Sequence, residues 1–217
     1  SVTNNLLKDN KNSLNSCSSK ILNLASFGYC LPNKGFPELI KAIGVLQESD
    51  IAIHLQMFTA LYDESFQWFY KELIHLRDGL GLKQKIDIDI NYLSEDKILN
   101  ALSKVDLIVY PYQTTNESSS AAVRQGIASG TPVAVTPLSI FDDVAKVVRF
   151  LPGTCVDDIA LGIRKFYNEN LLASKNKNLI KEKELHESWL EQHRFSRVSS
   201  RLQGLIRGVE TDKYFFD

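Results

Sequence analysis

The sequence has little of several features that would place it in a specialised class of protein. It contains no apolar run near the roughly 20 residues that a membrane-spanning helix needs, and its first residues lack the apolar centre of a signal peptide. Its three cysteines are odd in number and lie far apart, so they fit neither a disulfide framework nor paired thiolate ligands of a metal. These absences predict a protein of the reducing cytoplasm.

Positive charge is not in excess either. The chain has 25 lysines and arginines against 26 aspartates and glutamates, which gives a formal net charge of −1. Non-specific binding of nucleic acid needs a basic surface that neutralises phosphates, so we expect no nucleic-acid partner. The 217 residues, 44% of them hydrophobic, suffice for one large domain with a buried core.

The chain divides into three parts by composition and periodicity. Residues 1–19 are rich in Asn, Ser and Lys and predict a linker or a disordered end. Residues 20–170 alternate short apolar runs with segments of helical period, which predicts an α/β fold with a parallel sheet and crossover helices. The expected strands are residues 21–27, 51–58, 86–92, 106–112 and 132–136.

Residues 171–217 predict carboxyl-terminal helices. Apolar residues recur there at spacings of three and four, which is the pattern of a helix with one apolar face. We expect these helices to pack on the domain itself or on an amino-terminal domain that is missing here. The stripe consists of Phe195, Val198, Leu202, Leu205 and Ile206.

The loop after the first expected strand has features that suit an anion. Ligands of open parallel sheets bind where the strands end. Gly28 and Gly35 allow tight turns and a close approach of the backbone, Lys34 supplies a positive charge, and a helix over Pro37–Gln47 starts directly afterwards. The loop matches neither a P-loop nor a Gly-x-Gly-x-x-Gly fingerprint. An ordinary surface loop with an exposed lysine explains the same residues.

The segment after the fourth expected strand is the most informative one. The strand ends at Pro111, and a helix is predicted from about Ser118 to Ser129. The N–H groups and hydroxyls of Ser118, Ser119 and Ser120, with the positive end of the helix dipole, suit a phosphate or a polyhydroxylated ligand. A serine-rich capped helix without a ligand is the alternative.

A Lys-Gly loop, a helix, and then an acidic residue that opens a helix ending in Ala-Ser-Gly-Thr-Pro-Val follow one another in this sequence. This order resembles the carboxyl-terminal domain of retaining glycosyltransferases of the GT-B fold, the group that includes sucrose and mannosyl transferases. The resemblance covers about residues 20 to 170. It implies a Rossmann-like parallel sheet with flanking helices and a retaining hexosyltransferase that uses a nucleotide-sugar donor and no metal.

The resemblance also has consequences for the acceptor. The acceptor, a saccharide or a lipid-linked molecule in glycan or cell-surface polysaccharide synthesis, would bind to the missing amino-terminal domain. Two-domain relatives are nearly twice as long, so we expect the chain alone to be an inactive half. Peripheral membrane association of the full-length protein stays open, as do the base, the sugar and the linkage.

The resemblance assigns roles to individual residues. In this family a lysine contacts the diphosphate and the first of two glutamates eight positions apart contacts the sugar, which implies Lys34 and Glu117 as catalytic residues. The second glutamate is Gln125 here, whose carbonyl can accept from a ribose hydroxyl. The arginine usual before the lysine is replaced by Gly28, and the candidate substitutes are Arg124 and Arg149.

Further donor contacts follow from the same resemblance. The small turn residues after the first glutamate are here Ser118–Ser120, whose backbone N–H groups keep their contacts. Tyr92 and Leu93 are implied near the base, although Tyr92 fits half-buried packing equally well. The implied donor site is Gly28, Lys34, Tyr92, Glu117, Ser118, Ser119, Ser120, Arg124 and Gln125.

The sequence also contains a motif that is typical of another fold. Asp87 and Asp89 form an Asp-x-Asp, the metal-binding signature of the other large glycosyltransferase fold. They alternate with isoleucines, so both carboxylates lie on one face of a strand that we expect to be solvated. We therefore predict no metal site and no cofactor. The rival functions are a non-catalytic nucleotide-sugar-binding module and an epimerase or phosphorylase of the same fold.

Overall fold

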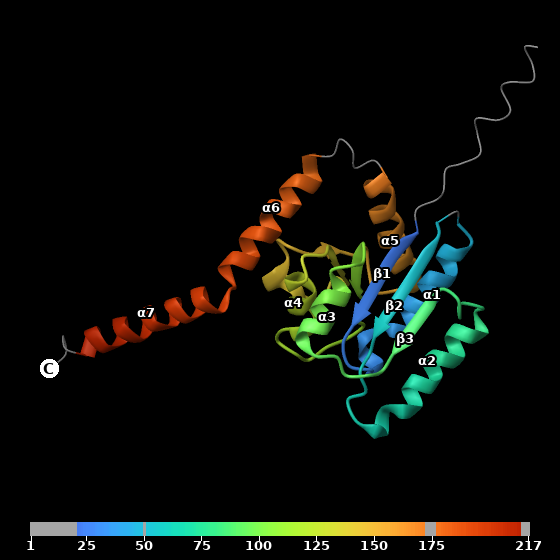
Figure 1. Cartoon of the computed structure of the whole chain (residues 1–217), viewed down its shortest axis with the longest axis horizontal. Coiled ribbons are helices and arrows are strands. Elements are labelled where there is room, and N and C mark those ends of the chain that lie inside the picture. Colours follow the sequence, from blue (N-terminus) through green and yellow to red (C-terminus); the bar gives the residue numbers. More distant parts are fainter. Residues whose placement is uncertain (1–20, 50, 172–176, 214–217) are drawn as a thin grey trace, which may run out of the picture.

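Six parallel strands form a single sheet in the computed structural model, which describes residues 21–49, 51–171 and 177–213 (Figure 1). The linker predicted over residues 1–19 lies outside these residues. The strand order is β3-β2-β1-β4-β5-β6, so consecutive connections run outward in opposite directions from β1 and β4. The strands are β1 (Leu22–Phe27), β2 (Ile53–Phe58), β3 (Ile86–Asp89), β4 (Leu107–Tyr110), β5 (Val133–Val135) and β6 (Arg149–Phe150). Such a reversal opens a crevice at the carboxyl ends of the strands, where ligands of this class of fold bind.

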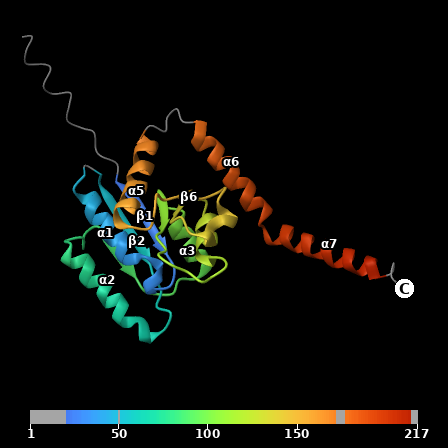
Figure 2. The same cartoon turned by 180° about the vertical axis from the view of Figure 1, so that it is seen from behind.

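Helices cover both faces of the sheet. One face packs against α1 (Phe36–Gln47), α2 (Gln67–Gly79) and α5 (Val156–Leu171), and the other against α3 (Glu95–Leu102) and α4 (Ala121–Ala128) (Figure 2). The apolar residues between the sheet and α1, α2 and α5 form a first core, and those between the sheet and α3 and α4 form a second core. Neighbouring residues of β1 point to opposite faces of the sheet, because Leu24 belongs to the first core and Ala25 to the second. Short 3-10 turns complete the domain at η1 (Pro32–Lys34), η2 (Glu64–Phe66) and η3 (Ser139–Val144). The predicted α/β fold with a parallel sheet is confirmed.

The five expected strands are present, each shorter than its apolar run. β4 is buried at all four residues, as expected of a central strand with helices on both sides. The sequence prediction missed β6, which pairs with β5 at only two residues, one of them exposed. So short and half-exposed a strand has no periodicity to detect.

Helix α4 packs closely on strand β4. Tyr110 is fully buried and donates its hydroxyl hydrogen bond to the carbonyl of Ala122 at 2.6 Å. Burial raises the pKa of this phenol well above its usual range, so the hydroxyl stays a neutral donor. A Cβ at Gly126 would lie 2.5 Å from the Tyr110 oxygen, so only glycine allows the helix to pack this closely.

The carboxyl-terminal helices α6 (Lys177–Gln192) and α7 (Phe195–Lys213) leave the sheet domain, and α7 points away from it (Figure 1). α6 contacts the domain through His186, whose Nε2 lies 2.5 Å from the Ile127 carbonyl oxygen, and through Trp189 and Leu190. The predicted apolar stripe of α7 is exposed, with Phe195 88% and Leu205 69% accessible. The stripe therefore does not pack on the sheet domain, which was one of the two expected partners.

The environments of two cysteines predict a difference in reactivity. Cys30 is buried in the first core, and burial raises its pKa to about 11, whereas Cys155 is exposed. At pH 8 a thiol with a pKa of about 11 is only ~0.1% ionised. In a Cys17→Ser variant, we expect one thiol to react rapidly with a disulfide reagent at pH 8 and the second to react only after denaturation. Two rapid reactions in the folded variant would contradict the burial of Cys30.

Candidate functional site

A cavity of about 440 Å³ opens at the carboxyl ends of β1, β2 and β4, where the strand order reverses. Residues from the loops after β1, β2, β3 and β4 line it together with the first turns of α3 and α4. It contains seven of the predicted donor-site residues, which lie far apart in the sequence. They are Gly28, Lys34, Tyr92, Glu117, Ser119, Ser120 and Gln125.

The loop after β1 is held close to the loop after β4 by a glycine. Gly35 follows the η1 turn with φ 73°, in the left-handed region that favours glycine. A Cβ at this position would lie 1.8 Å from the carbonyl oxygen of Pro111, so the two backbones are in contact. This contact carries Lys34, the residue before the glycine, to the edge of the cavity, where it is only 6% exposed.

Amide hydrogen bonds hold the two loops in register. The backbone N–H of Gln113 donates to the carbonyl of Asn33 at 3.0 Å, and the Asn33 side chain donates to the carbonyl of Thr114 at 3.3 Å. The Gln113 side chain donates to the carbonyls of Pro111 and Thr154 at 2.9 and 3.0 Å. The segment from Pro111 to Glu117 is irregular, yet its backbone is anchored at several points.

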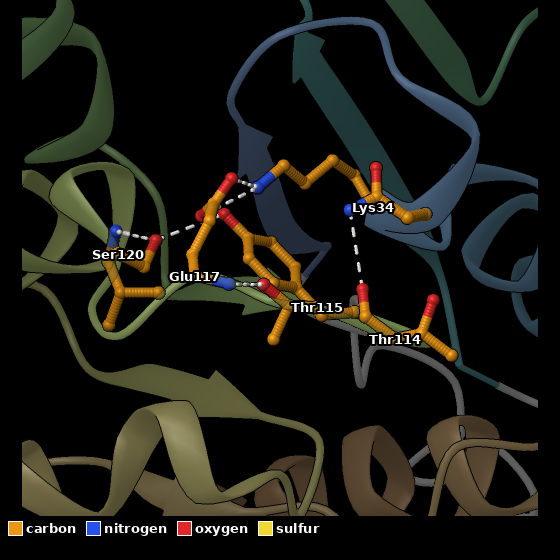
Figure 3. Close-up of polar contacts among 8 residues, drawn as sticks. Lys34, Thr114, Thr115, Glu117 and Ser120 are labelled. Carbon is orange, nitrogen blue, oxygen red and sulfur yellow. Dashed lines mark hydrogen bonds and ion pairs between the residues drawn. The ribbon is translucent and has the colours of Figure 1, made fainter.

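The two residues predicted to be catalytic contact one another in the cavity (Figure 3). The Lys34 ammonium lies 3.4 Å from both carboxylate oxygens of Glu117, and the Glu117 side chain is 51% exposed. The ammonium also lies 4.1 Å from the ring centroid of Tyr112, within the range of a cation–π interaction. The sequence prediction missed Tyr112, because an aromatic residue after the strand matches no motif.

The helix predicted to begin at Ser118 begins at Ala121 instead, so that prediction was wrong by about one turn. Ser120 has extended backbone angles and is the N-cap, because its hydroxyl accepts from the Val123 N–H at 3.3 Å. The N–H groups that the helix end presents are consequently those of Ala121 and Ala122, and both residues line the cavity. Ser118 is not among the lining residues that the structure describes.

The two arginines considered as substitutes for the missing phosphate cation are engaged elsewhere. Arg124 forms an ion pair with Asp143 and donates to the Ser120 carbonyl at 3.1 Å. Arg149 forms an ion pair with Glu169 and lies over the Phe166 ring at β6. Among the described residues, Lys34 is the only lysine or arginine that lines the cavity.

Tyr92 lines the cavity and is 79% exposed, which contradicts the alternative of half-buried packing. Its neighbour Leu93 is partly buried against the second core. Helix α4 contributes Gln125, which lies one turn after Ala121 on the same helix face. An exposed aromatic ring beside apolar residues is suited to stacking on a base.

The aspartates of the Asp-x-Asp are occupied by protein groups. Asp87 is exposed and lies 3.1 Å from the His54 ring nitrogen, and Asp89 accepts from the backbone and side-chain nitrogens of Asn91 at 2.9 and 2.7 Å. Within residues 21–49, 51–171 and 177–213, no three His, Cys, Asp or Glu side chains lie in a group that could hold a metal ion.

No family model and no curated protein matches the sequence, but solved structures match its fold. A glycosyltransferase from Rickettsia africae ESF-5 superposes with a TM-score of 0.72 at 15% identity, over 88% of this chain and 48% of that one. The carboxyl-terminal domain of a glycosyl transferase group 1 family protein (LpcC) from Francisella tularensis gives 0.61 at 16% identity, over 79% of this chain and 85% of that one. The chain has the fold of a GT-B carboxyl-terminal domain.

A further structure of this fold contains a nucleotide. Anabaena HepE, solved in complex with UDP and glucose, superposes with a TM-score of 0.65 at 14% identity, over 88% of this chain and 48% of that one. The chain thus spans about half the length of the Rickettsia and Anabaena proteins. None of the helices within residues 21–49, 51–171 and 177–213 has both the length and the apolar character needed to cross a membrane.

Two glycines test the contact between the loops. Gly35 and Gly130 have similar left-handed angles, φ 73° and 81°, but an added Cβ meets the Pro111 carbonyl at the first and open space at the second. Gly130→Ala should cost only the backbone strain, about 1–2 kcal/mol of unfolding free energy. Gly35→Ala should cost a further ~1–3 kcal/mol from overpacking. Urea denaturation measures both, and equal losses would show that the loops separate without cost.

Proposed function

We propose that this chain binds a nucleotide-sugar by its diphosphate and forms the donor half of a retaining glycosyltransferase. The observation that carries the proposal is the convergence of Lys34 and the amino-terminal end of α4 on one cavity at the switch point of the sheet. A lysine ammonium and free helix N–H groups are donors that favour an anion. The likeness in fold to glycosyltransferases supports the same assignment.

The ion pair in the cavity suggests how the diphosphate is accepted. Lys34 is nearly buried, and the exposed Glu117 carboxylate accepts from its ammonium. An incoming diphosphate would compete for the ammonium and free the carboxylate. Glu117 would then accept from sugar hydroxyls, on the side of the cavity where the sugar extends from the phosphates.

The remaining lining residues supply neutral contacts to the donor. Gln125 would accept from or donate to the ribose hydroxyls, and the hydroxyl of Ser119 would reach the phosphates or the sugar. Tyr92 would stack on the base. Together these side chains would orient the donor in the cavity.

In this mechanism the protein supplies no nucleophile. Lys34 and the N–H groups of Ala121 and Ala122 stabilise the negative charge that develops on the diphosphate as it leaves the anomeric carbon. We expect no metal requirement, because the ammonium and the positive end of the helix dipole offset part of this charge. The reaction proceeds with retention of the anomeric configuration.

The acceptor is assigned to an amino-terminal domain. The chain spans about half the length of the matched full-length structures, so the other half would provide the acceptor site. The exposed apolar stripe of α7 is the surface that would pack against that domain. The acceptor is a saccharide or a lipid-linked molecule of cytoplasmic glycan or polysaccharide synthesis, and this chain alone binds the donor without transferring it.

A second function is favoured by one observation. Gln125 stands where the resemblance expects a glutamate, and a neutral amide holds a ribose less strongly than a carboxylate does. A nucleotide-sugar-binding module without transferase activity would need only this weaker contact to the ribose. The two functions separate when the chain is joined to its amino-terminal half, because only the transferase then releases nucleoside diphosphate in the presence of an acceptor.

Removing the charge of Lys34 and removing that of Glu117 should weaken the binding of different parts of the donor. Lys34→Met keeps the aliphatic stem but loses the ammonium. It should weaken the binding of the nucleoside diphosphate and of the nucleotide-sugar alike, by about 10- to 100-fold. A charge-assisted hydrogen bond contributes roughly 1.5–3 kcal/mol, which corresponds to this range. Glu117→Gln should weaken the nucleotide-sugar but leave the diphosphate unchanged or tighter, because repulsion is relieved. Calorimetry with both ligands measures this.

The matched control for these variants is Lys41→Met, which removes an exposed lysine of α1 outside the cavity. It should change neither affinity. Equal weakening of both ligands by Glu117→Gln, or an unchanged diphosphate affinity in folded Lys34→Met, would refute the assignment of roles.

Donor binding should not depend on a divalent metal. The described residues hold no metal-binding group, and Asp87 and Asp89 already have protein partners. Excess chelator should leave the nucleoside diphosphate affinity unchanged within about twofold, and Asp87→Ala should have no effect. Loss of binding with chelator, restored by manganese in the wild type but not in Asp87→Ala, would mean that these aspartates hold a metal.

A further inference from the structure

A buried tyrosine connects the two parts of the cavity that favour an anion. Tyr112 is 2% exposed and follows Pro111 in the loop after β4. Its ring packs edge to face against Tyr110 at 6.3 Å and against Phe141 at 5.4 Å between centroids. Its carbonyl accepts from the Thr136 hydroxyl at 2.7 Å. These contacts fix both the backbone and the plane of the ring.

One end of this arrangement is the lysine. The Lys34 ammonium lies 4.1 Å from the centroid of the Tyr112 ring. The ring attracts the cation through its quadrupole and carries no net charge. Unlike Glu117, it therefore holds the ammonium without neutralising it, and a diphosphate that displaces the Glu117 carboxylate does not displace the ring.

The other end is the start of helix α4. The Tyr112 hydroxyl shares a hydrogen bond of 3.0 Å with the hydroxyl of Ser120, which in turn accepts from the Val123 N–H. Ser120 is 3% exposed and lies in the same close-up as Lys34 and Glu117 (Figure 3). One rigid side chain thus sets the spacing between the ammonium and the first helical N–H groups.

We propose that Tyr112 is a positioning residue for the diphosphate, which holds the Lys34 ammonium in place through its ring and the first turn of α4 through its hydroxyl. This inference rests on the proposed function of the cavity. It adds that the ring face, more than the hydroxyl, determines the affinity for the diphosphate. The ring contacts the ammonium directly, whereas the hydroxyl acts on the helix only through Ser120, which also has its own bond to the Val123 N–H.

The test compares Tyr112→Phe, which keeps the ring, with Tyr112→Leu, which removes it. UDP, GDP and ADP are first titrated into the wild-type chain. The affinities of all variants are then measured for the diphosphate that binds most tightly and, in a competition experiment against it, for the corresponding free nucleoside. Tyr112→Leu should weaken the diphosphate by about 5- to 30-fold, and Tyr112→Phe by less than about threefold. Neither should change the nucleoside affinity by more than about twofold, because the nucleoside lacks the diphosphate.

A double-mutant cycle distinguishes positioning from general packing. If Tyr112 acts through Lys34, Tyr112→Leu should have almost no further effect on diphosphate affinity in a Lys34→Met chain. Tyr70→Leu, which removes a half-buried tyrosine of α2 away from the cavity, controls for lost packing and should leave both affinities unchanged. Undiminished weakening by Tyr112→Leu in the Lys34→Met chain would overturn the inference.

A spectroscopic measurement on the wild-type chain covers the case in which Tyr112→Leu does not fold. The side-chain methylene protons of Lys34 should resonate upfield of their ordinary positions because of the ring current, and should stay there when the diphosphate binds. Ordinary positions in the bound state would overturn the inference.

The proposed function fails separately, and the inference with it, if the wild-type chain binds none of the three diphosphates. If the wild type binds and Lys34→Met weakens binding while Tyr112→Leu does not, only the inference about Tyr112 fails.

Discussion

The backbone contact between Gly35 and Pro111 places Lys34 at the edge of the cavity. Without it, the loop after β1 and the loop after β4 would lie apart, and Lys34 would be an ordinary surface lysine. With it, the ammonium is brought over Tyr112 and beside Glu117, and the loops are fixed by the bonds between Gln113 and Asn33. The electrostatics of the site therefore depend on the positive φ of Gly35 and on the hydrogen bonds of Gln113 and Asn33, because these hold Lys34 in place.

The core beneath the cavity makes this arrangement largely preformed. Strand β4 is buried throughout, Tyr110 anchors the first turn of α4, and Gly126 allows the helix to approach the strand. Side chains that are fixed before a ligand arrives lose little entropy on binding, so the affinity depends mainly on charge and shape. In the proposed binding mode the group that rearranges is the Glu117 carboxylate, whose side chain is 51% exposed.

The sequence predicted the features that depend on periodicity and local chemistry. Alternation of apolar runs predicted the parallel sheet. The glycine and lysine that the first loop offered for an anion, Gly28 and Lys34, line one cavity with Glu117 and Gln125. What it missed depends on contacts between distant segments. The orientation of Arg124 toward Asp143 and the ring of Tyr112 under Lys34 have no local pattern, and β6 pairs at only two residues. The start of α4 was placed early because three consecutive serines are all good N-caps, and tertiary contacts of Tyr112 and Tyr110 select Ser120.

The central claim is that a diphosphate binds between Lys34 and the first turn of α4. Amide nuclear magnetic resonance of this chain, titrated with a nucleoside diphosphate, tests it most directly. We predict that the largest shifts belong to the backbone amides of Lys34, Gly35, Ala121 and Ala122, with the free nucleoside shifting residues near Tyr92 instead. Shifts that cluster away from these amides, for instance around His186 of α6, would contradict the account.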